Sequence, residues 1–273
     1  MKPLLSSVLV SALAAILIAS TSVSPPVAHA QRVPDDARAI LEAVHARDEG
    51  DRGRARVRMT IRDARGATRV RDLSILGLRG EGSLHTLVRF ESPSDVAGTT
   101  LLTRDYDDAR TDEQWLHLPA FRRTTRIVGA GRARSFLGSD LTFADLTRRH
   151  PDDFDATLLG QEDVGGERSW RLALTPRTDA IRDELGYSRI EVWIARRTLL
   201  VLRSKATLLD GRFKYVQAED VAQVDGIWVA RRLVARTVRG TTLESETVLE
   251  RREVRFGDAT VTPALFEPSR LGE

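Results

Sequence analysis

The side chains in this sequence that could do chemistry form no recognisable catalytic or metal-binding set. The four histidines after residue 30 are isolated, with none three or four positions from another: His45, His85, His117 and His150. A zinc site needs three or four ligands that are usually clustered. Cysteine is absent, and neither a G-x-S-x-G nucleophile motif nor a P-loop occurs. The sequence therefore favours a protein that is not an enzyme and that uses no metal and no cofactor.

Two acidic loops and one glycine loop come close to known ligand-binding motifs. The acidic loops are Asp105/Asp107/Asp108 and Asp152/Asp153/Asp155, and the glycine loop is Gly129-Ala130-Gly131. Neither acidic loop has the glycine and the terminal glutamate of an EF-hand. In the glycine loop, Arg134 stands where a dinucleotide-binding loop needs a third small residue. We interpret both acidic loops as ordinary solvated loops, with weak calcium binding as the alternative, and the glycine loop as no dinucleotide site.

Arginine is the one chemically capable residue that gathers in a single region. Between residues 90 and 146 it occurs at Arg104, Arg110, Arg122, Arg123, Arg126, Arg132 and Arg134. A guanidinium group suits planar, multi-donor contacts with a carboxylate or a phosphate. We predict that Arg122, Arg123, Arg126, Arg132 and Arg134 contact an anionic headgroup or a partner protein near the mouth of a cavity. The alternative is that they are solvated loop charges.

The first thirty residues have the pattern of a secretory signal peptide. Lys2 is followed by an apolar stretch over residues 4–19 and by Ala28-His29-Ala30, which predicts cleavage after Ala30. We expect residues 31–273 to form a single domain in the periplasm. Removing Lys2 from the 42 basic residues leaves 41 against 39 acidic residues, a net charge of +2. Such a balance argues against a nucleic-acid partner.

The elements that position these residues are predicted to be mostly strands. Over residues 54–62, Ala55, Val57, Met59 and Ile61 alternate with polar residues, as in a strand with one buried face. Further strands are expected at 68–79, 84–91, 99–103, 113–118, 154–162, 168–175, 188–195, 198–208, 213–224, 228–239 and 243–255. Asp210-Gly211 and Asp225-Gly226 are typical of hairpin turns. From these twelve candidate stretches we expect about ten to eleven strands, too many for a flat open sheet.

Helices are expected to be few and short. Residues 34–48 have the spacing of an amphipathic helix, with Ile40, Leu41 and Val44 on one face. We predict that this helix covers the concave side of the sheet as a lid. A second short helix is expected to begin near Ser139 or Asp140 and to end at Leu146. The fold class is therefore mainly β (α+β), an antiparallel meander that curls.

Five stretches of the chain resemble a known family. They read P-S-D-V-A-G-T-T-L-L, Q-W-L-H-L-P-A-F-R-R, S-F-L-G-S-D-L-T-F-A-D-L, E-V-W-I-A-R-R-T-L-L-V-L-R-S-K-A-T-L-L-D-G-R-F-K and P-A-L-F-E-P-S-R-L. Together they are similar to the outer-membrane lipoprotein-sorting proteins of the LolA-like superfamily. The resemblance implies a curved antiparallel half-barrel with short covering helices around an apolar cavity.

The resemblance also implies a function, the binding and carriage of lipids or acylated molecules in the periplasm without catalysis. The residues that we expect to line the cavity are Val57, Met59, Ile61, Leu73, Ile75, Leu101, Trp115, Phe136, Leu141 and Phe143. The expected partners are the cargo, an inner-membrane exporter and an outer-membrane acceptor, with the protein itself a monomer. Because the tryptophan block and the arginines depart from the lipoprotein carrier proper, an alternative stays open. It is an accessory or sensor subunit of a resistance-nodulation-division-type lipid exporter.

Overall fold

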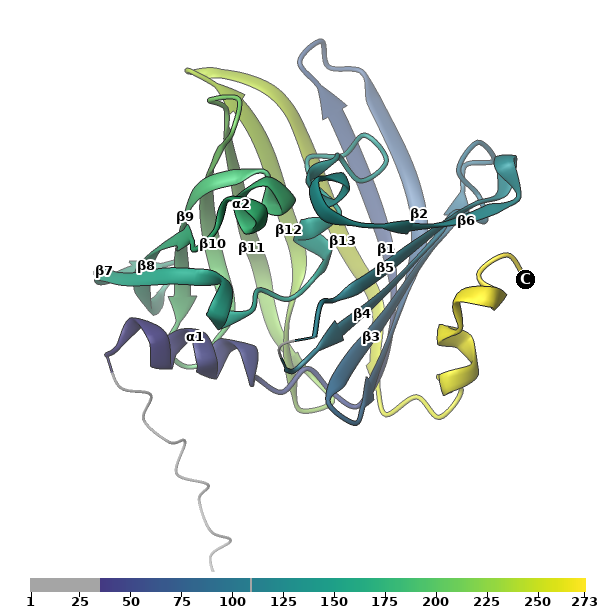
Figure 1. Cartoon of the computed structure of the whole chain (residues 1–273), viewed down its shortest axis with the longest axis horizontal. Helices are drawn as coiled ribbons and strands as arrows, with labels where there is room; N and C mark the ends of the chain where they lie inside the picture. The colour runs from purple at the N-terminus through teal and green to yellow at the C-terminus, as the bar shows by residue number, and fades with distance from the viewer. Residues whose placement is uncertain (1–34, 109) are drawn as a thin grey trace, which may run out of the picture. The chain divides into compact units, whose positions relative to one another are not determined.

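The structure, a computed structural model, describes residues 35–108 and 110–273 (Figure 1). These residues form one antiparallel sheet of thirteen strands and two α-helices. The strands are β1 (Arg52–Asp63), β2 (Thr68–Gly80), β3 (Ser83–Ser92), β4 (Thr100–Tyr106), β5 (Glu113–Leu118), β6 (Arg123–Ile127), β7 (Phe154–Val164), β8 (Glu167–Pro176), β9 (Tyr187–Ala195), β10 (Val201–Leu208), β11 (Phe213–Val224), β12 (Ile227–Arg239) and β13 (Thr242–Phe256). The helices are α1 (Ala37–His45) and α2 (Asp179–Leu185). The predicted signal peptide, residues 1–30, lies outside the described residues.

The sheet consists of two meanders that meet in its centre. Its strand order is β6-β5-β4-β3-β2-β1-β13-β12-β11-β10-β9-β8-β7. Hairpins join neighbours within each half, whereas the pairing of β1 with β13 joins the start of the sheet to its end. The sheet stays open and curves around α1 and α2 (Figure 1). This arrangement confirms the predicted fold class, a curved antiparallel half-barrel with short covering helices.

The thirteen strands exceed the predicted ten or eleven: all twelve candidate stretches form strands, and β6 is the one strand outside them. Its sequence is Arg-Thr-Thr-Arg-Ile, and four of its five residues are exposed. It pairs only with β5, because it is an edge of the sheet. A strand that buries neither face lacks the alternation of apolar and polar residues from which strands are predicted. β1, in contrast, buries Ala55, Val57, Met59 and Ile61 in the predicted alternation.

Local capping explains where the two helices begin and end. Asp36 caps α1, and its side chain accepts a hydrogen bond from the backbone nitrogen of Ala39 at 2.8 Å. Thr178 caps α2 in the same manner. α2 ends at Gly186, whose φ of 74° is the left-handed conformation that glycine adopts without strain. Within the described residues, no helix has the length and apolar character needed to cross a bilayer.

The two faces of the sheet carry different coverings. The inner face packs against α1, α2 and the segment that follows β6 (Figure 1). The outer face near β2 to β4 is covered by two turns of 3-10 helix at the C-terminus, η5 (Pro263–Phe266) and η6 (Pro268–Arg270). Phe266 and Leu271 of this C-terminal stretch pack there against Leu87 and Leu102. The inner face, around which the sheet curves, is therefore the face that can enclose a ligand.

Candidate functional site

The segment of residues 134–146, which we call the plug, lies on the inner face of the sheet. It folds back on itself, since Ser135 forms a β-bridge with Thr142 and the Phe136 nitrogen donates to the Leu141 carbonyl at 2.7 Å. It ends in a single 3-10 turn, η3 (Ala144–Leu146). The short helix predicted from Ser139 or Asp140 to Leu146 is therefore wrong. Leu137 and Gly138 adopt positive φ angles of 51° and 76°, which turn the chain before a helix could begin.

Asp140 anchors the plug to the middle of the sheet. Its carboxylate accepts hydrogen bonds from Thr237 Oγ1 at 2.5 Å and from Thr247 Oγ1 at 2.6 Å. The hydroxyl of Ser245 adds a third such bond at 2.5 Å. These donors lie on β12 and β13, far along the chain from the plug. A carboxylate held by three hydroxyl groups fixes the plug without a paired cation.

Asp145 provides a second anchor on the same face. Lys214 Nζ on β11 and Tyr187 Oη on β9 both donate to its carboxylate, and all three side chains are buried. Burial alone would raise the pKa of Asp145, but the charges of Lys214 and Arg149 and the two hydrogen bonds lower it below its ordinary value. Burial lowers the pKa of Lys214, while Asp145 opposes this. Asp145 and Lys214 therefore form a buried ion pair.

The aromatic residues of the plug fill the space above the first half of the sheet. The rings of Phe136 and Phe143 lie 5.5 Å apart, and Phe136 also lies 5.6 Å from Phe90. Eight of the ten predicted cavity residues pack in this one cluster, namely Val57, Met59, Ile61, Leu73, Ile75, Leu101, Phe136 and Phe143. Leu141 is buried within the plug. The structure thus brings these residues together, and their binding of a ligand stays a prediction.

Trp115 lies apart from the other predicted cavity residues. In the register of β4 and β5, Leu102 opposes Trp115 and Leu101 opposes Leu116. Because side chains alternate between the two faces of a strand, Leu101 and Leu116 face the plug while Trp115 faces outward. It packs on the outer-face cluster that includes Leu102 and Phe266. The structure corrects the expectation that Trp115 lines the inner cavity.

The predicted lid residues belong to α1 and cover the second half of the inner face. Ile40 and Leu41 are buried against residues of β7 to β10, including Phe154, Trp170 and Ile190, and Val44 packs beside them. Register places this cluster and the plug on one face, because Ala206 of the cluster opposes Lys214, which binds Asp145. The position of α1 is therefore compatible with a lid, and its movement stays a prediction.

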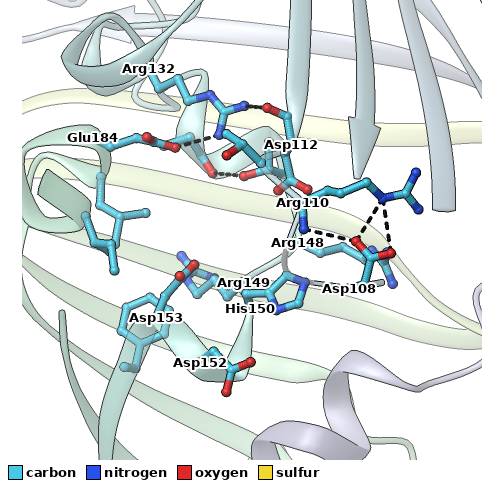
Figure 2. Close-up of a pocket in the computed structure, with 16 residues that line it drawn as sticks. Asp108, Arg110, Asp112, Arg132, Arg148, Arg149, His150, Asp152, Asp153 and Glu184 are labelled. Carbon is cyan, nitrogen blue, oxygen red and sulfur yellow. Dashed lines mark hydrogen bonds and ion pairs between the residues drawn. The ribbon is translucent and has the colours of Figure 1, made fainter. Parts of the chain in front are cut away.

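The five predicted headgroup arginines do not form one site. Arg132 is buried, and its guanidinium pairs with Glu184 of α2 at 2.6 Å and donates to the Asp112 carbonyl (Figure 2). This contact joins the plug region to α2, so Arg132 is unavailable to a headgroup. Arg134 is exposed at the start of the plug. The other three are exposed together on the β5–β6 hairpin, and we call Arg122, Arg123 and Arg126 the arginine hairpin.

A polar pocket of about 290 Å³ opens between α2, the end of the plug and the loop after β4. Figure 2 shows its carboxylates and guanidinium groups interleaved, with Arg110 bonded to Asp108 and Arg132 to Glu184. Beside it, burial and, to a smaller extent, the nearby carboxylate of Asp112 together raise the pKa of Asp105 to about 8. Acids and bases largely satisfy one another here, so the pocket resembles a solvated charge network more than a ligand site.

Two histidines that are far apart in the sequence meet near this pocket. The ring centroids of His45 and His150 are 4.6 Å apart. Burial lowers the pKa of His45, and the charge of Arg148 lowers it further. Neither ring nitrogen of His45 has a hydrogen-bond partner among residues 35–108 and 110–273. Sequence spacing could not find this pair, and no group of three or more metal-ligating side chains occurs in the described part of the chain.

A second space, which we call the apolar cavity, lies on the inner face beyond the plug. Its volume is about 370 Å³, within the roughly 300–1,000 Å³ that is usual for small-molecule sites. Its walls come from β1, β2, β3 and β10 to β13 and are mostly aliphatic, with Ile75, Leu84, Val201, Ile227, Leu233 and Val254 among them. Arg47, Arg54 and Arg251 also reach it. Of the predicted cavity residues, Ile75 lines this space.

Comparisons with known proteins agree with this geometry. A family model described only as an uncharacterized protein matches residues 82–273. The chain is similar to the crystal structure of a DUF1329 family protein from Desulfovibrio piger, with 27% identity and a TM-score of 0.76 over 86% of this chain and 97% of that one. No curated protein matches the chain.

Two further crystal structures share the fold. A putative outer membrane lipoprotein-sorting protein domain from Vibrio parahaemolyticus is 24% identical, with a TM-score of 0.77 over 87% of this chain and 98% of that one. A LolA superfamily protein from Nitrosomonas europaea is 17% identical, with a TM-score of 0.62 over 85% of this chain and 97% of that one. At these identities the likeness concerns the fold.

Proposed function

The chain belongs to the family whose model matches residues 82–273 and shares the fold of the LolA-like outer-membrane lipoprotein-sorting proteins, and we propose on this premise that it binds and carries lipids or acylated molecules in the periplasm. The proposed function has no catalytic step. The single observation that carries it is the apolar cavity on the inner face, with a volume of about 370 Å³. Each methylene group that such walls remove from water contributes about 0.8 kcal/mol. An acyl chain would thus be held without any polar contact.

The location and the partners form the finer part of this proposal. The predicted signal peptide over residues 1–30 supports export to the periplasm. A carrier of lipids between two membranes would receive its cargo from an inner-membrane exporter and deliver it to an outer-membrane acceptor. The plug and α1, which both cover the inner face, are the elements whose displacement would enlarge the cavity for a longer cargo.

One observation favours the second candidate, an accessory or sensor subunit of a lipid exporter that acts through protein contacts. The β5–β6 hairpin and the loop after it expose two apolar side chains, Phe121 at 75% and Val128 at 63% of their surface. They flank the arginine hairpin at the free edge of the sheet. Exposed apolar groups beside positive charge are typical of a protein interface. This surface could serve either function.

The experiment is to identify what the protein carries when it is purified from the periplasm without detergent. Mass spectrometry of an organic extract should find lipid, and the emptied protein should take up a fluorescent fatty acid. Gly77→Phe should block uptake, because Gly77 lines the cavity and a Cβ added there meets no atom within 4 Å. Ser74→Phe, on the opposite face of the same strand, is the matched control. Absence of both extracted lipid and uptake in the unchanged protein would refute the proposal.

A further inference from the structure

One charged side chain in the apolar cavity has no acidic partner. Arg251 lies on β13 opposite Val57 of β1, and this register places it on the inner face with Leu249 and Thr247. Its Nη1 atom donates to the carbonyl oxygen of Ala230 at 2.5 Å. Within residues 35–108 and 110–273 it forms no ion pair, and its Nη2 and Nε atoms form no hydrogen bond. The guanidinium is thus half-buried and lines the cavity.

The neighbouring arginines differ from Arg251 in this respect. At the cavity wall, Arg47 pairs with Glu49 at 2.8 Å and Arg54 pairs with Asp258 at 3.2 Å. Three more arginines of β12 and β13 lie near Arg251, and each has its own carboxylate: Arg231 with Asp220, Arg232 with Glu219 and Arg252 with Glu250. Glu49 attracts Arg251 only from a distance. The cavity therefore keeps one uncompensated positive charge.

An uncompensated charge in an apolar setting is costly for the folded protein. Burial lowers the pKa of Arg251, and the charge of Arg47 lowers it further. A guanidinium nevertheless stays protonated in proteins, so the charge persists. Transfer of an ion from water into an apolar environment is strongly unfavourable unless the ion is paired. A ligand that supplied the missing anion would remove this cost on binding.

We propose that the apolar cavity binds an amphiphile with one anionic head, a carboxylate or a phosphate, whose head pairs with Arg251 while its alkyl chain lies on the aliphatic walls. This inference rests on the proposed lipid-binding function and adds the class of ligand. The guanidinium fork matches the oxygens of a carboxylate or phosphate in a two-point contact. A neutral lipid leaves the charge unpaired, and a cationic one is repelled.

The test measures displacement of a fluorescent fatty acid from the detergent-free protein by three ligands that share one chain length. They are hexadecanoate, hexadecyl phosphate and hexadecanol. The unchanged protein should bind the two anions about ten- to one-hundred-fold more tightly than the alcohol, the range that a hydrogen bond to a charged group supplies. Comparing the two anions distinguishes a carboxylate site from a phosphate site.

Two neighbouring substitutions separate the role of Arg251 from general electrostatics. Arg251→Met keeps the length of the side chain and should remove the preference for anions while leaving hexadecanol binding unchanged. Arg252→Met removes an exposed charge one residue away and should change neither the preference for anions nor the binding of hexadecanol. The melting temperature of Arg251→Met should be unchanged or raised, because the variant loses a half-buried charge that has no acidic partner.

The outcomes distinguish this inference from the proposed function. Equal binding of the alcohol and the anions, or an unchanged preference in Arg251→Met, would refute the inference while lipid binding stands. Failure of the unchanged protein to bind any of the three ligands would refute the proposed function itself. If Arg252→Met abolishes the preference for anions as fully as Arg251→Met does, the preference comes from surface charge, and the proposed role of Arg251 is refuted.

Discussion

Replacement of Asp145 by asparagine should strongly destabilise the protein. The substitution keeps the shape of the side chain and removes the charge that faces Lys214 Nζ. The ammonium group would then remain buried with a neutral partner, since only 3% of the Lys214 side chain is exposed. Breaking a buried pair by removing one partner costs about 3–5 kcal/mol. Because Asp145 also accepts a hydrogen bond from Tyr187, the upper half of this range is expected.

The assay is equilibrium urea unfolding followed by tryptophan fluorescence, which the chain supports with four tryptophans. In thermal melting a loss of about 4–5 kcal/mol corresponds to about 8–20 °C for a domain of this size. Asp152→Asn is the matched control, because Asp152 also pairs with a cation, Arg38, but its side chain is 66% exposed. An exposed pair contributes little, so the control should melt close to the unchanged protein.

A double variant tests whether the cost comes from the stranded ammonium group. Asp145→Asn combined with Lys214→Met should recover much of the stability lost by Asp145→Asn alone, since no buried charge is then left unpaired. The reasoning is refuted if Asp145→Asn costs no more than Asp152→Asn. It is also refuted if the double variant is less stable than the single one.

Three further predictions concern pH, the lid and the free edge of the sheet. The pKa of Asp105 is raised to about 8, so its contribution to stability is fully present below the unfolded pKa near 3.8 and is lost as pH rises towards 8. Asp105→Asn should therefore reduce the fall in the free energy of unfolding between these pH values, as measured by urea unfolding at several pH values. Replacing Ile40 and Leu41 together with aspartate should cost more than about 4 kcal/mol, because both side chains are buried, and an unchanged melting temperature would contradict the placement of α1. Charge reversal of the whole arginine hairpin should leave melting intact and weaken salt-sensitive binding to anionic vesicles; equal binding would make these ordinary surface charges.

Local physics accounts for what the sequence by itself determined. The alternation of apolar residues in β1 places Val57, Met59 and Ile61 on one face, and the structure buries all three. The turn at Asp225-Gly226 has positive φ at both residues, 47° and 87°, as a tight hairpin requires. Such features depend on neighbours only a few residues away. They can therefore be predicted from a single sequence, and they suffice to predict a curled antiparallel meander.

The contacts that define the candidate site depend on pairing across the chain. Trp115 fails as a cavity residue because the register of β4 and β5, rather than its size, decides which face it occupies. Asp140 and Asp145 lie in the short helix that the sequence predicts, and only the packing of the plug on β9, β11, β12 and β13 gives them their hydrogen-bond donors.

The same holds for Arg251, one of many arginines in the sequence. It differs from its neighbours Arg47, Arg54 and Arg252 because each of them forms an ion pair with a carboxylate and Arg251 does not. Whether an arginine forms an ion pair depends on which side chains surround it in the folded protein. For Arg251, the hydrogen-bonded register of β1 and β13 decides which side chains these are. The sequence determined which strands form and that they curl; only the tertiary structure decided which charge is left alone in the apolar cavity.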